Sequence, residues 1–526
     1  MAVTLTGTTG NDTLFGSTAQ AAYVKGKEGG DRLVSQYTNS TLIGNAGNDL
    51  LEIQAGDGSV ITMNPGKGDD TVSISGLTTL GTLYVANGLG TSVNYGDDTF
   101  SFDTAGGAVF LQGTVRGGEG NDTLTMANGV DGNGFKYNGG QGKDQITVSA
   151  NTSVLFSNTQ LRAGKGADSA NLVFNTGAIF NGFTVAGGNG ADTINFNANS
   201  GFNASANNLI DLGDQADVFS GTFIPVSGFI SGSFDVVGGG AADTITVLVS
   251  GSMTGAFDLG IYGDSTAVDT TAGGADTIAF NLANSAQDTT GMVAGGFGAD
   301  TITISSNITA GSAGFSVNGG LGNDSITITD GGALAGTVNG GEGADRITFN
   351  MGSGLTAVNN PDGQGYVTLL GGAGNDTFTN TTVNTGGGAS AYAATGLVMA
   401  IQDFATGDLI ELLGVKVVNE DANVERSAFV TRSFLTNSAV GMTGRSMNNV
   451  AMYRDGDDVV LQITTGSGTA AAGEDLATDG SGVGLAVIRF VDNSAFATQI
   501  DASSGALSNA GISFQQTTTG FKINFT

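Results

Sequence analysis

A short turn motif, Gly-x-Gly-x-Asp followed by a polar and then an apolar residue, recurs along most of this chain. Its clearest copies are residues 117–124, 187–194, 295–302, 319–326, 340–347 and 371–378. With the altered copies, sixteen motif aspartates are spaced 18 to 33 residues apart, namely Asp12, Asp31, Asp49, Asp70, Asp98, Asp122, Asp144, Asp168, Asp192, Asp217, Asp243, Asp276, Asp300, Asp324, Asp345 and Asp376. A repeat of this length is typical of solenoid proteins, in which every repeat forms one coil.

The segments between the motifs alternate apolar and polar residues. One alternation follows each aspartate, as in residues 301–304, and another precedes the next glycine pair, as in residues 315–318. Each repeat therefore reads as strand, variable turn, strand and glycine turn. The sequence predicts an all-β fold, a right-handed parallel β-solenoid with one glycine-aspartate turn per coil and the apolar residues pointing inward.

Composition narrows the class of protein. Glycine occurs 90 times but proline only three times, and 39% of residues are hydrophobic, which favours a folded chain in which glycine marks turns. The chain has no cysteine and no histidine, so thiolate sites, Ser-His-Asp triads and zinc-protease motifs are excluded. A net charge of −31 disfavours nucleic acid and anionic lipid as partners and suits cations. No apolar run is long enough for a membrane span.

The motif predicts calcium binding. Glycine permits positive φ, which lets backbone carbonyls converge, and aspartate adds a carboxylate, so each turn offers the hard oxygen ligands that Ca²⁺ prefers. A single copy would be explained better by an Asx hydrogen bond that caps the turn, but a dozen copies in register favour calcium held between neighbouring coils. The candidate ligands are Asp12, Asp49, Asp70, Asp98, Gly118, Gly120, Asp122, Gly140, Gly142, Asp144, Asp168, Gly188, Gly190, Asp192, Asp217, Asp243, Asp276, Gly296, Gly298, Asp300, Gly320, Gly322, Asp324, Gly341, Gly343, Asp345, Gly372, Gly374 and Asp376.

The repeat resembles the calcium-binding RTX nonapeptide GGxGxDxUx, over about residues 1 to 390. This resemblance implies a parallel β-roll that folds when calcium binds outside the cell. It also implies type I secretion through an uncleaved C-terminal signal, in keeping with an N-terminus that shows no cleavable signal. RTX toxins and proteases run their motifs in tandem, whereas here single motifs stand apart. In this respect the chain is similar to the RTX-repeat surface-layer and biofilm-matrix proteins of Gram-negative bacteria.

The last part of the sequence differs from the repeats. We expect a calcium-binding solenoid over residues 1–395 and a β-rich cap over residues 396–526 that serves secretion and assembly. A Gly- and Ala-rich loop, residues 386–396, leads to residues 401–412, which are similar to the step that closes many RTX rolls. Strands are expected at residues 459–463 and 485–490, with a hairpin turn at residues 454–457. A cap would cover the apolar surface and edge groups of the last coil.

The expected function is an extracellular, calcium-dependent structural protein that assembles with itself into a surface layer or matrix sheet, and not an enzyme. The alternative is an adhesin or biofilm-matrix protein without a lattice, with cell-surface polysaccharide as a second candidate partner. A polysaccharide lyase, with Arg116, Arg162 or Arg346 as base, is the weaker alternative, because the chain has no Trp and scattered Tyr. Ice binding is disfavoured because the turn positions that would carry a uniform rank of Thr hold a mixed set from Glu119 to Ala373.

Overall fold

The computed structural model contains strands and turns but no helix among the residues that it describes, which confirms the all-β prediction. That part of the chain accordingly contains no helix long and apolar enough to cross a membrane. The described residues are 3–16, 20–36, 39–54, 57–58, 61–75, 79–80, 83–85, 96–151, 153–225, 232–250, 257–264, 273–283, 289–306, 313–330, 334–351, 367–380, 399–413, 448–455, 458–465, 483–490, 512–516 and 520–525. The predicted loop at residues 386–396 lies outside them.

The chain divides into two compact units, Met1–Gly273 and Gly274–Thr526, and the expected boundary after residue 395 stays a prediction. The strands of the first unit are β1 (Val3–Thr6), β2 (Thr13–Phe15), β3 (Ala22–Lys25), β4 (Arg32–Ser35), β5 (Thr41–Ala46), β6 (Leu50–Ile53), β7 (Asp57–Gly58), β8 (Ile61–Lys67), β9 (Thr71–Ser75), β10 (Thr79–Leu80), β11 (Leu83–Val85), β12 (Thr99–Glu119), β13 (Thr123–Gln141), β14 (Gln145–Ala150), β15 (Leu155–Ser157), β16 (Gln160–Lys165), β17 (Ser169–Phe174), β18 (Ile179–Asn181), β19 (Thr184–Asn189), β20 (Thr193–Ala204), β21 (Asn208–Asp214), β22 (Val218–Pro225), β23 (Ser233–Gly240), β24 (Thr244–Ser250) and β25 (Phe257–Asp264).

The strands of the second unit follow the same alternation until its last part. They are β26 (Thr277–Ala283), β27 (Thr289–Phe297), β28 (Thr301–Ser306), β29 (Ala313–Leu321), β30 (Ser325–Asp330), β31 (Leu334–Glu342), β32 (Arg346–Met351), β33 (Val367–Ala373), β34 (Thr377–Asn380), β35 (Met399–Ile401), β36 (Leu409–Leu413), β37 (Asn448–Asp455), β38 (Asp458–Thr465), β39 (Val483–Phe490), β40 (Ile512–Gln516) and β41 (Gly520–Phe525).

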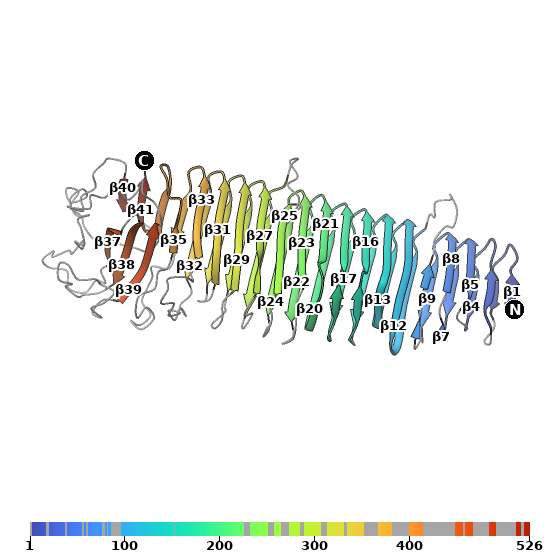
Figure 1. Ribbon diagram of the computed structural model, residues 1–526. Helices are drawn as coiled ribbons and strands as arrows, with labels where there is room; N and C mark the ends of the chain where they lie inside the picture. The colour runs from blue at the N-terminus through green and yellow to red at the C-terminus, as the bar shows by residue number, and fades with distance from the viewer. Residues whose placement is uncertain are drawn as a thin grey trace, which may run out of the picture. The chain divides into compact units, whose positions relative to one another are not determined.

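Within each unit the strands form two parallel rows (Figure 1). Strands that follow a motif aspartate pair with one another and form the Asp-side row, as β14, β17, β20 and β22 do in the first unit and β28, β30 and β32 in the second. Strands that precede a glycine turn form the Gly-side row, as β16, β19, β21 and β23 do in the first unit and β29 and β31 in the second. Each coil therefore pairs with the next coil of its unit, which confirms the parallel β-solenoid. Its right-handedness stays a prediction.

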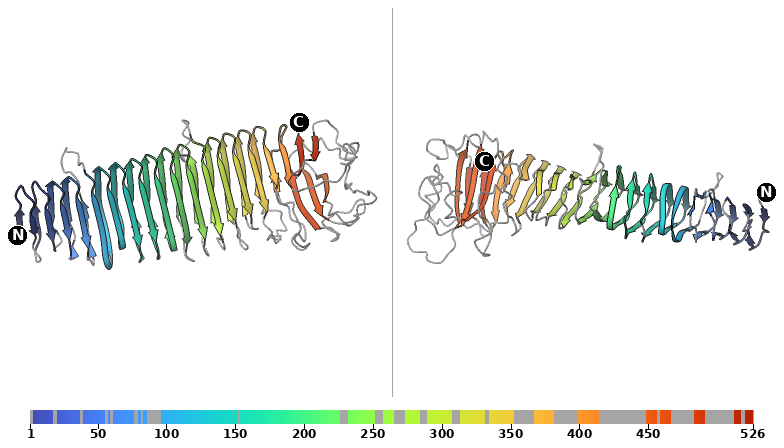
Figure 2. Two further views of the ribbon diagram at one scale, coloured as in Figure 1. Left: turned by 180° about the vertical axis from the view of Figure 1, so that it is seen from behind. Right: turned by 60° about the horizontal axis from the view of Figure 1, so that its bottom comes forward.

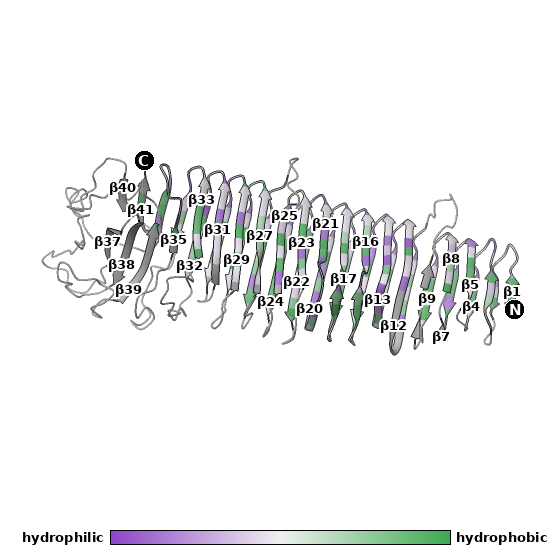
Figure 3. Cartoon of the chain, viewed as in Figure 1, coloured by the Kyte–Doolittle hydropathy of each residue, from purple (hydrophilic) through white to green (hydrophobic). Residues whose placement is uncertain are grey.

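The interior of the coils is filled by the alternating apolar residues. Ile302 and Ile304 in β28 and Phe196 in β20 are fully buried, and in Figure 3 apolar and polar residues alternate along the strands. Each such side chain contributes about 1.5–3 kcal/mol by leaving water. In the first unit, the rings of Phe174 and Phe180 meet edge to face within one coil, with centres 5.0 Å apart, and the ring of Phe174 lies 5.5 Å from that of Phe196 in the next coil. The predicted inward positions are confirmed.

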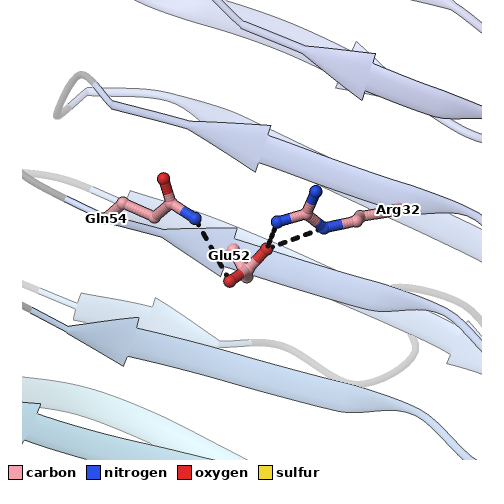
Figure 4. Close-up of polar contacts among 3 residues, drawn as sticks. All are labelled: Arg32, Glu52 and Gln54. Carbon is pink, nitrogen blue, oxygen red and sulfur yellow. Dashed lines mark hydrogen bonds and ion pairs between the residues drawn. The ribbon is translucent and has the colours of Figure 1, made fainter.

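Outward side chains also join neighbouring coils. Arg32 in β4 forms a 2.7 Å ion pair with Glu52 in β6, and the amide of Gln54 donates to the other carboxylate oxygen of Glu52 (Figure 4). The guanidinium of Arg32 lies 5.6 Å from the ring centre of Phe15 in β2. Such contacts act between one coil and the next, as expected of a fold whose stability is a sum over neighbouring coils.

The second unit ends in antiparallel strands (Figure 2). β36 pairs with β41, and β41 pairs with β40. β37 and β38 form the hairpin predicted around residues 454–457, and β38 pairs with β39, so both strands expected in this region are confirmed. β39 also joins β35 in parallel. That these strands act as a cap stays a prediction.

Candidate metal site

The glycine turns have the backbone conformation that the motif predicts. Gly140 and Gly142, the second and fourth residues of one copy, have φ values of 116° and 141°. A Cβ atom on Gly142 would lie 1.8 Å from the carbonyl oxygen of Gly120 in the preceding coil, so no larger residue fits. Positive φ is confirmed at every glycine named as a candidate ligand, namely Gly118, Gly120, Gly140, Gly142, Gly188, Gly190, Gly296, Gly298, Gly320, Gly322, Gly341, Gly343, Gly372 and Gly374.

The motif aspartates stack into one hydrogen-bonded row in each unit, which we call the Asp ladder. The backbone N–H of Asp122 donates a 2.7 Å hydrogen bond to Oδ1 of Asp144, and the N–H of Asp144 donates a 2.6 Å bond to Oδ1 of Asp168. The first unit brings together Asp12, Asp31, Asp49, Asp70, Asp98, Asp122, Asp144, Asp168, Asp192, Asp217 and Asp243. The second unit brings together Asp276, Asp300, Asp324, Asp345, Asp376 and Asp408.

Each ladder step is closed by a second backbone bond in the opposite direction. The N–H of Gln145 donates to the carbonyl oxygen of Asp122 at 2.7 Å, beside the bond from Asp122 to Asp144. The Asx hydrogen bond considered from the sequence is therefore present, although it runs between coils and not within one turn. It uses only one of the two carboxylate oxygens.

The second carboxylate oxygen, Oδ2, has no hydrogen-bond donor among the described residues at most inner steps of the ladder. Asp122 is fully buried and Asp144 is 2% exposed, so water does not replace the missing donor at their surfaces. A buried polar atom without a partner costs about 1–3 kcal/mol, and more when it is charged. The described side chains with such an Oδ2 atom include Asp49, Asp70, Asp122, Asp144, Asp168, Asp192, Asp217, Asp324 and Asp345.

The first two steps of the ladder differ from these inner steps. Oδ2 of Asp31 accepts a 3.0 Å hydrogen bond from the backbone N–H of Lys27, and Oδ2 of Asp12 accepts from the N–H and hydroxyl of Thr8. In the clear copies the residue four positions before the aspartate is instead a glycine at positive φ, such as Gly118 before Asp122. Each aspartate named above as lacking this donor has a residue at positive φ four positions earlier, which is Asn45 before Asp49 and glycine in the other copies.

A backbone oxygen of the next coil lies near the same carboxylate oxygen. A Cβ atom added to Gly139 would lie 2.3 Å from Oδ2 of Asp144 and 2.3 Å from the carbonyl oxygen of Ala163. A Cβ on Gly319 would likewise lie 2.3 Å from Oδ2 of Asp324 and 2.2 Å from the carbonyl oxygen of Gly340. Two acceptors therefore meet beside the first glycine of the motif. A proton or a cation beside this glycine would reduce the repulsion between the two acceptors.

The electrostatics of the ladder agree with this geometry. Burial, reinforced by neighbouring aspartates, raises the pKa of Asp122 to about 8, although the backbone hydrogen bond from Asp98 lowers it. Burial also raises the pKa of Asp144 to about 7 and that of Asp345 to about 6, each opposed by a ladder hydrogen bond. Carboxylates in this environment are poorly stabilised as anions unless a positive charge accompanies them.

The donor set fits a hard cation. In the described part of the chain, no three His, Cys, Asp or Glu side chains gather around one point, so a metal here would not be held by carboxylates alone. The available ligands are a carboxylate oxygen and backbone carbonyl oxygens, all of which are ligand types that Ca²⁺ accepts. Soft transition metals would find neither thiolate nor imidazole, because the chain has no cysteine and no histidine.

Two ladder residues were missing from the predicted ligands. Asp31 was recognised only as a weak motif copy, and Asp408 was placed in the closing segment. Oδ1 of Asp408 accepts a 2.9 Å bond from the N–H of Asp376, and Oδ2 accepts from the N–H of Ala405. The signal in the sequence was the Gly-Asp pair at 407–408 followed by an apolar strand, which repeats the end of the motif.

The three arginines considered for a lyase do not form one site. Arg116 and Arg162 lie on the Gly-side row of the first unit, separated by the coil that contains Asn138. Arg346 belongs to the second unit, where it forms a 2.7 Å ion pair with Glu411. Neither a protein-family model nor a characterised protein sequence matches this chain.

Proposed function

We propose that this protein is an extracellular structural protein that binds calcium along its Asp ladder and assembles with itself into a surface layer or matrix sheet. The observation that supports it most is the set of buried Oδ2 atoms that have no donor among the described residues, found at most inner steps of the ladder. A solenoid built only for its hydrogen bonds would gain stability from a neutral Asn or Ser at these positions. The sequence keeps aspartate in every copy.

Calcium would be held by Oδ2 of the motif aspartates and by carbonyl oxygens of the adjacent glycine turns. When bound, the ion supplies positive charge and coordination to oxygens that otherwise repel one another. Bound metal stabilises only the folded coil, because the unfolded chain does not bring these oxygens together. The extracellular medium, in which calcium is abundant, is the proposed location.

Self-assembly is supported by the charge of the chain and by its coil architecture. A net charge of −31 keeps copies apart until cations reduce it. If bound metal already orders the turns, little further conformational entropy is lost when the surfaces of two copies meet. The residue types of cysteine and histidine catalysis are absent from the sequence, so a structural role accounts for more of the chain than the lyase alternative does.

Electron microscopy of the purified full chain tests this proposal. We expect ordered sheets in millimolar calcium, dispersal in chelator, and no sheets in monovalent salt of equal ionic strength, because such salt screens charge without ordering the turns. Calcium binding by a chain that remains dispersed at high concentration would favour the adhesin or matrix alternative without a lattice. If the chain bound no calcium at all, the whole proposal would be refuted.

A further inference from the structure

The outer surface of the Gly-side row in the first unit separates its charges. Basic side chains lie on its earlier strands, with Lys136 on β13 and Arg162 on β16. Acidic side chains lie on later strands, with Asp211 on β21 and Asp235 on β23. In a chain with 17 basic and 48 acidic residues, a basic cluster on one side of a sheet is unexpected. We call the outward residues of β13, β16, β19, β21 and β23 the charged face.

Strand register aligns these charges in columns that run from coil to coil. Arg162 pairs with Ala186, and Ala186 pairs with Asp211, so Arg162 and Asp211 stand one coil to either side of β19 in one column. The parallel strand spacing puts their backbones about 10 Å apart, and no ion pair of the described residues joins the two side chains.

A second column, which contains Thr184, also has a basic and an acidic residue on opposite sides of β19, but each lies two coils from β19 and not one. These two residues are Lys136 and Asp235. Along the glycine turn, Lys165 and Asp214 stand one coil to either side of Asn189. Every one of these pairs has a basic residue before β19 and an acidic residue after it. The charged face is therefore antisymmetric in charge about the line of β19.

None of these side chains forms an ion pair within the described part of the chain. The ion pairs there are Arg32–Glu52, Arg346–Glu411 and Lys522–Glu411, none of which involves the charged face. Arg162 and Lys136 are exposed, and Asp211 and Asp235 are half-buried. Burial and then the charge of Asp214 raise the pKa of Asp211, with Arg162 opposing them, and burial followed by the charge of Asp258 raises that of Asp235. A cation from outside would stabilise both carboxylates.

We propose that the charged face binds the same face of a second copy of this chain, through a two-fold axis that runs along β19. Such an axis reverses the order of the coils while keeping each column opposite itself. Arg162 then meets Asp211 of the second copy, Lys136 meets its Asp235 and Lys165 meets its Asp214. Each pair occurs twice, because the contact is isologous.

The residues on the axis allow close approach. Thr184, Ala186 and Asn189 are outward residues of β19, and the first two are small. The long basic side chains reach from exposed positions toward carboxylates that are partly sunk into the opposite face. Complementary charge at this contact sets partner orientation and association rate more than it adds affinity. A nucleic acid would match only the basic half, so a second copy is the partner that uses both halves.

This inference deepens the proposed self-assembly by naming one of its contacts, and it is tested on the full chain in calcium, below the concentration that gives sheets. Sedimentation velocity should show a monomer–dimer equilibrium that shifts to monomer as salt rises. Arg162→Glu should weaken the dimer at least about tenfold, because it sets Glu against Asp twice. Asp211→Arg should weaken it as much. Lys67→Glu, the same charge change at an exposed site on β8, should leave the dimer intact.

An equal mixture of the Arg162→Glu and Asp211→Arg proteins gives the decisive result. Neither variant pairs with itself, but a mixed dimer restores both opposite-charge contacts, so dimer should return on mixing. A wild-type chain that is monomeric at every concentration, or a mixture that stays monomeric, would overturn the proposed face. Sheets that still form from the Arg162→Glu protein would also refute the face as an assembly contact while leaving the proposed function standing. If mixing restored the dimer but no sheets formed from the wild-type chain, the charged face would stand and the proposed surface-layer function would be refuted.

Discussion

The backbone N–H of Asp144 donates a 2.6 Å hydrogen bond to Oδ1 of Asp168 in the next coil of the first unit. This bond fixes the carboxylate of Asp168 and leaves its Oδ2 atom buried without a donor among the described residues. One carboxylate thus has two different roles. Oδ1 completes the backbone pairing between coils, and Oδ2 is the atom for which we propose a cation.

Calcium should therefore be required for full stability. We expect chelated protein to lose β-structure signal in circular dichroism or to melt at a lower temperature, and calcium to restore it. A concentration a hundredfold above the dissociation constant stabilises by about 2.7 kcal/mol for each site. Magnesium should be much less effective, because it keeps its waters and demands strict octahedral geometry. Equal melting temperatures in chelator and in calcium would argue against a metal at the ladder.

Replacing a ladder carboxylate by its amide should have opposite effects with and without calcium. In Asp144→Asn the amide keeps an oxygen acceptor for the N–H of Asp122 and places N–H donors where Oδ2 now lies, beside the carbonyl oxygen of Ala163. In chelator near pH 8 this change should raise the free energy of unfolding by about 1–3 kcal/mol, since it removes an unpartnered charge. In calcium it should lower metal binding by one site in isothermal titration calorimetry.

The matched control for that substitution is Asp31→Asn. There Oδ2 already accepts from the N–H of Lys27, and Oδ1 accepts from the N–H of Asp12, so an amide nitrogen must face a donor on one side. We expect Asp31→Asn to destabilise the chelated protein and to leave the number of bound calcium ions unchanged. If both substitutions changed the free energy of unfolding in chelator in the same direction, the distinction between these two ladder steps would be wrong.

Acid should stabilise the chelated protein. Burial raises the pKa of Asp144 to about 7 in the folded chain, well above its ordinary value of 3.8. A group with a raised folded pKa contributes its full stability below the unfolded pKa and loses it as the pH rises through the folded value. The melting temperature in chelator should therefore fall between about pH 4 and about pH 8. Saturating calcium should abolish this fall, because the ion favours the charged form of the carboxylates. A chelated protein whose melting temperature rose with pH would contradict the raised pKa values of the ladder.

The ion-pair cluster at the end of the second unit should hold β41 in place. Glu411 on β36 receives hydrogen bonds from Lys522 and Arg346, which outweigh the effect of burial and hold its pKa below the usual range. Glu411→Gln should lower the free energy of unfolding by about 1 kcal/mol and speed hydrogen exchange in β41. In the wild-type chain, the protection of β41 from exchange should be lost as the pH falls through the pKa of Glu411. Glu52→Gln, which breaks an ion pair in the first unit, should leave exchange in β41 unchanged. Unaltered exchange in β41 in the Glu411 variant would show that backbone pairing alone secures that strand.

The sequence by itself determined the coil and its contents. The alternation of Ile302 and Ile304 with polar residues decides which side chains enter the core, because successive residues of a strand point to opposite faces. A glycine such as Gly142, present in most motif copies, favours positive φ, so the turns stack and the aspartates come into line. The closing hairpin of β37 and β38 could be read in the same way from its turn residues and flanking strands.

Only the tertiary structure decided how the two oxygens of each aspartate are used and which outward charges share a column. The difference between Asp31 and Asp144 depends on whether a backbone N–H four residues earlier turns toward Oδ2, which residue types alone do not specify. The spacing between motif aspartates ranges from 18 to 33 residues, so the positions of Arg162 and Asp211 along the chain do not give their alignment. Backbone pairing absorbs the extra residues in the variable turns and sets both side chains in one column with Ala186 between them.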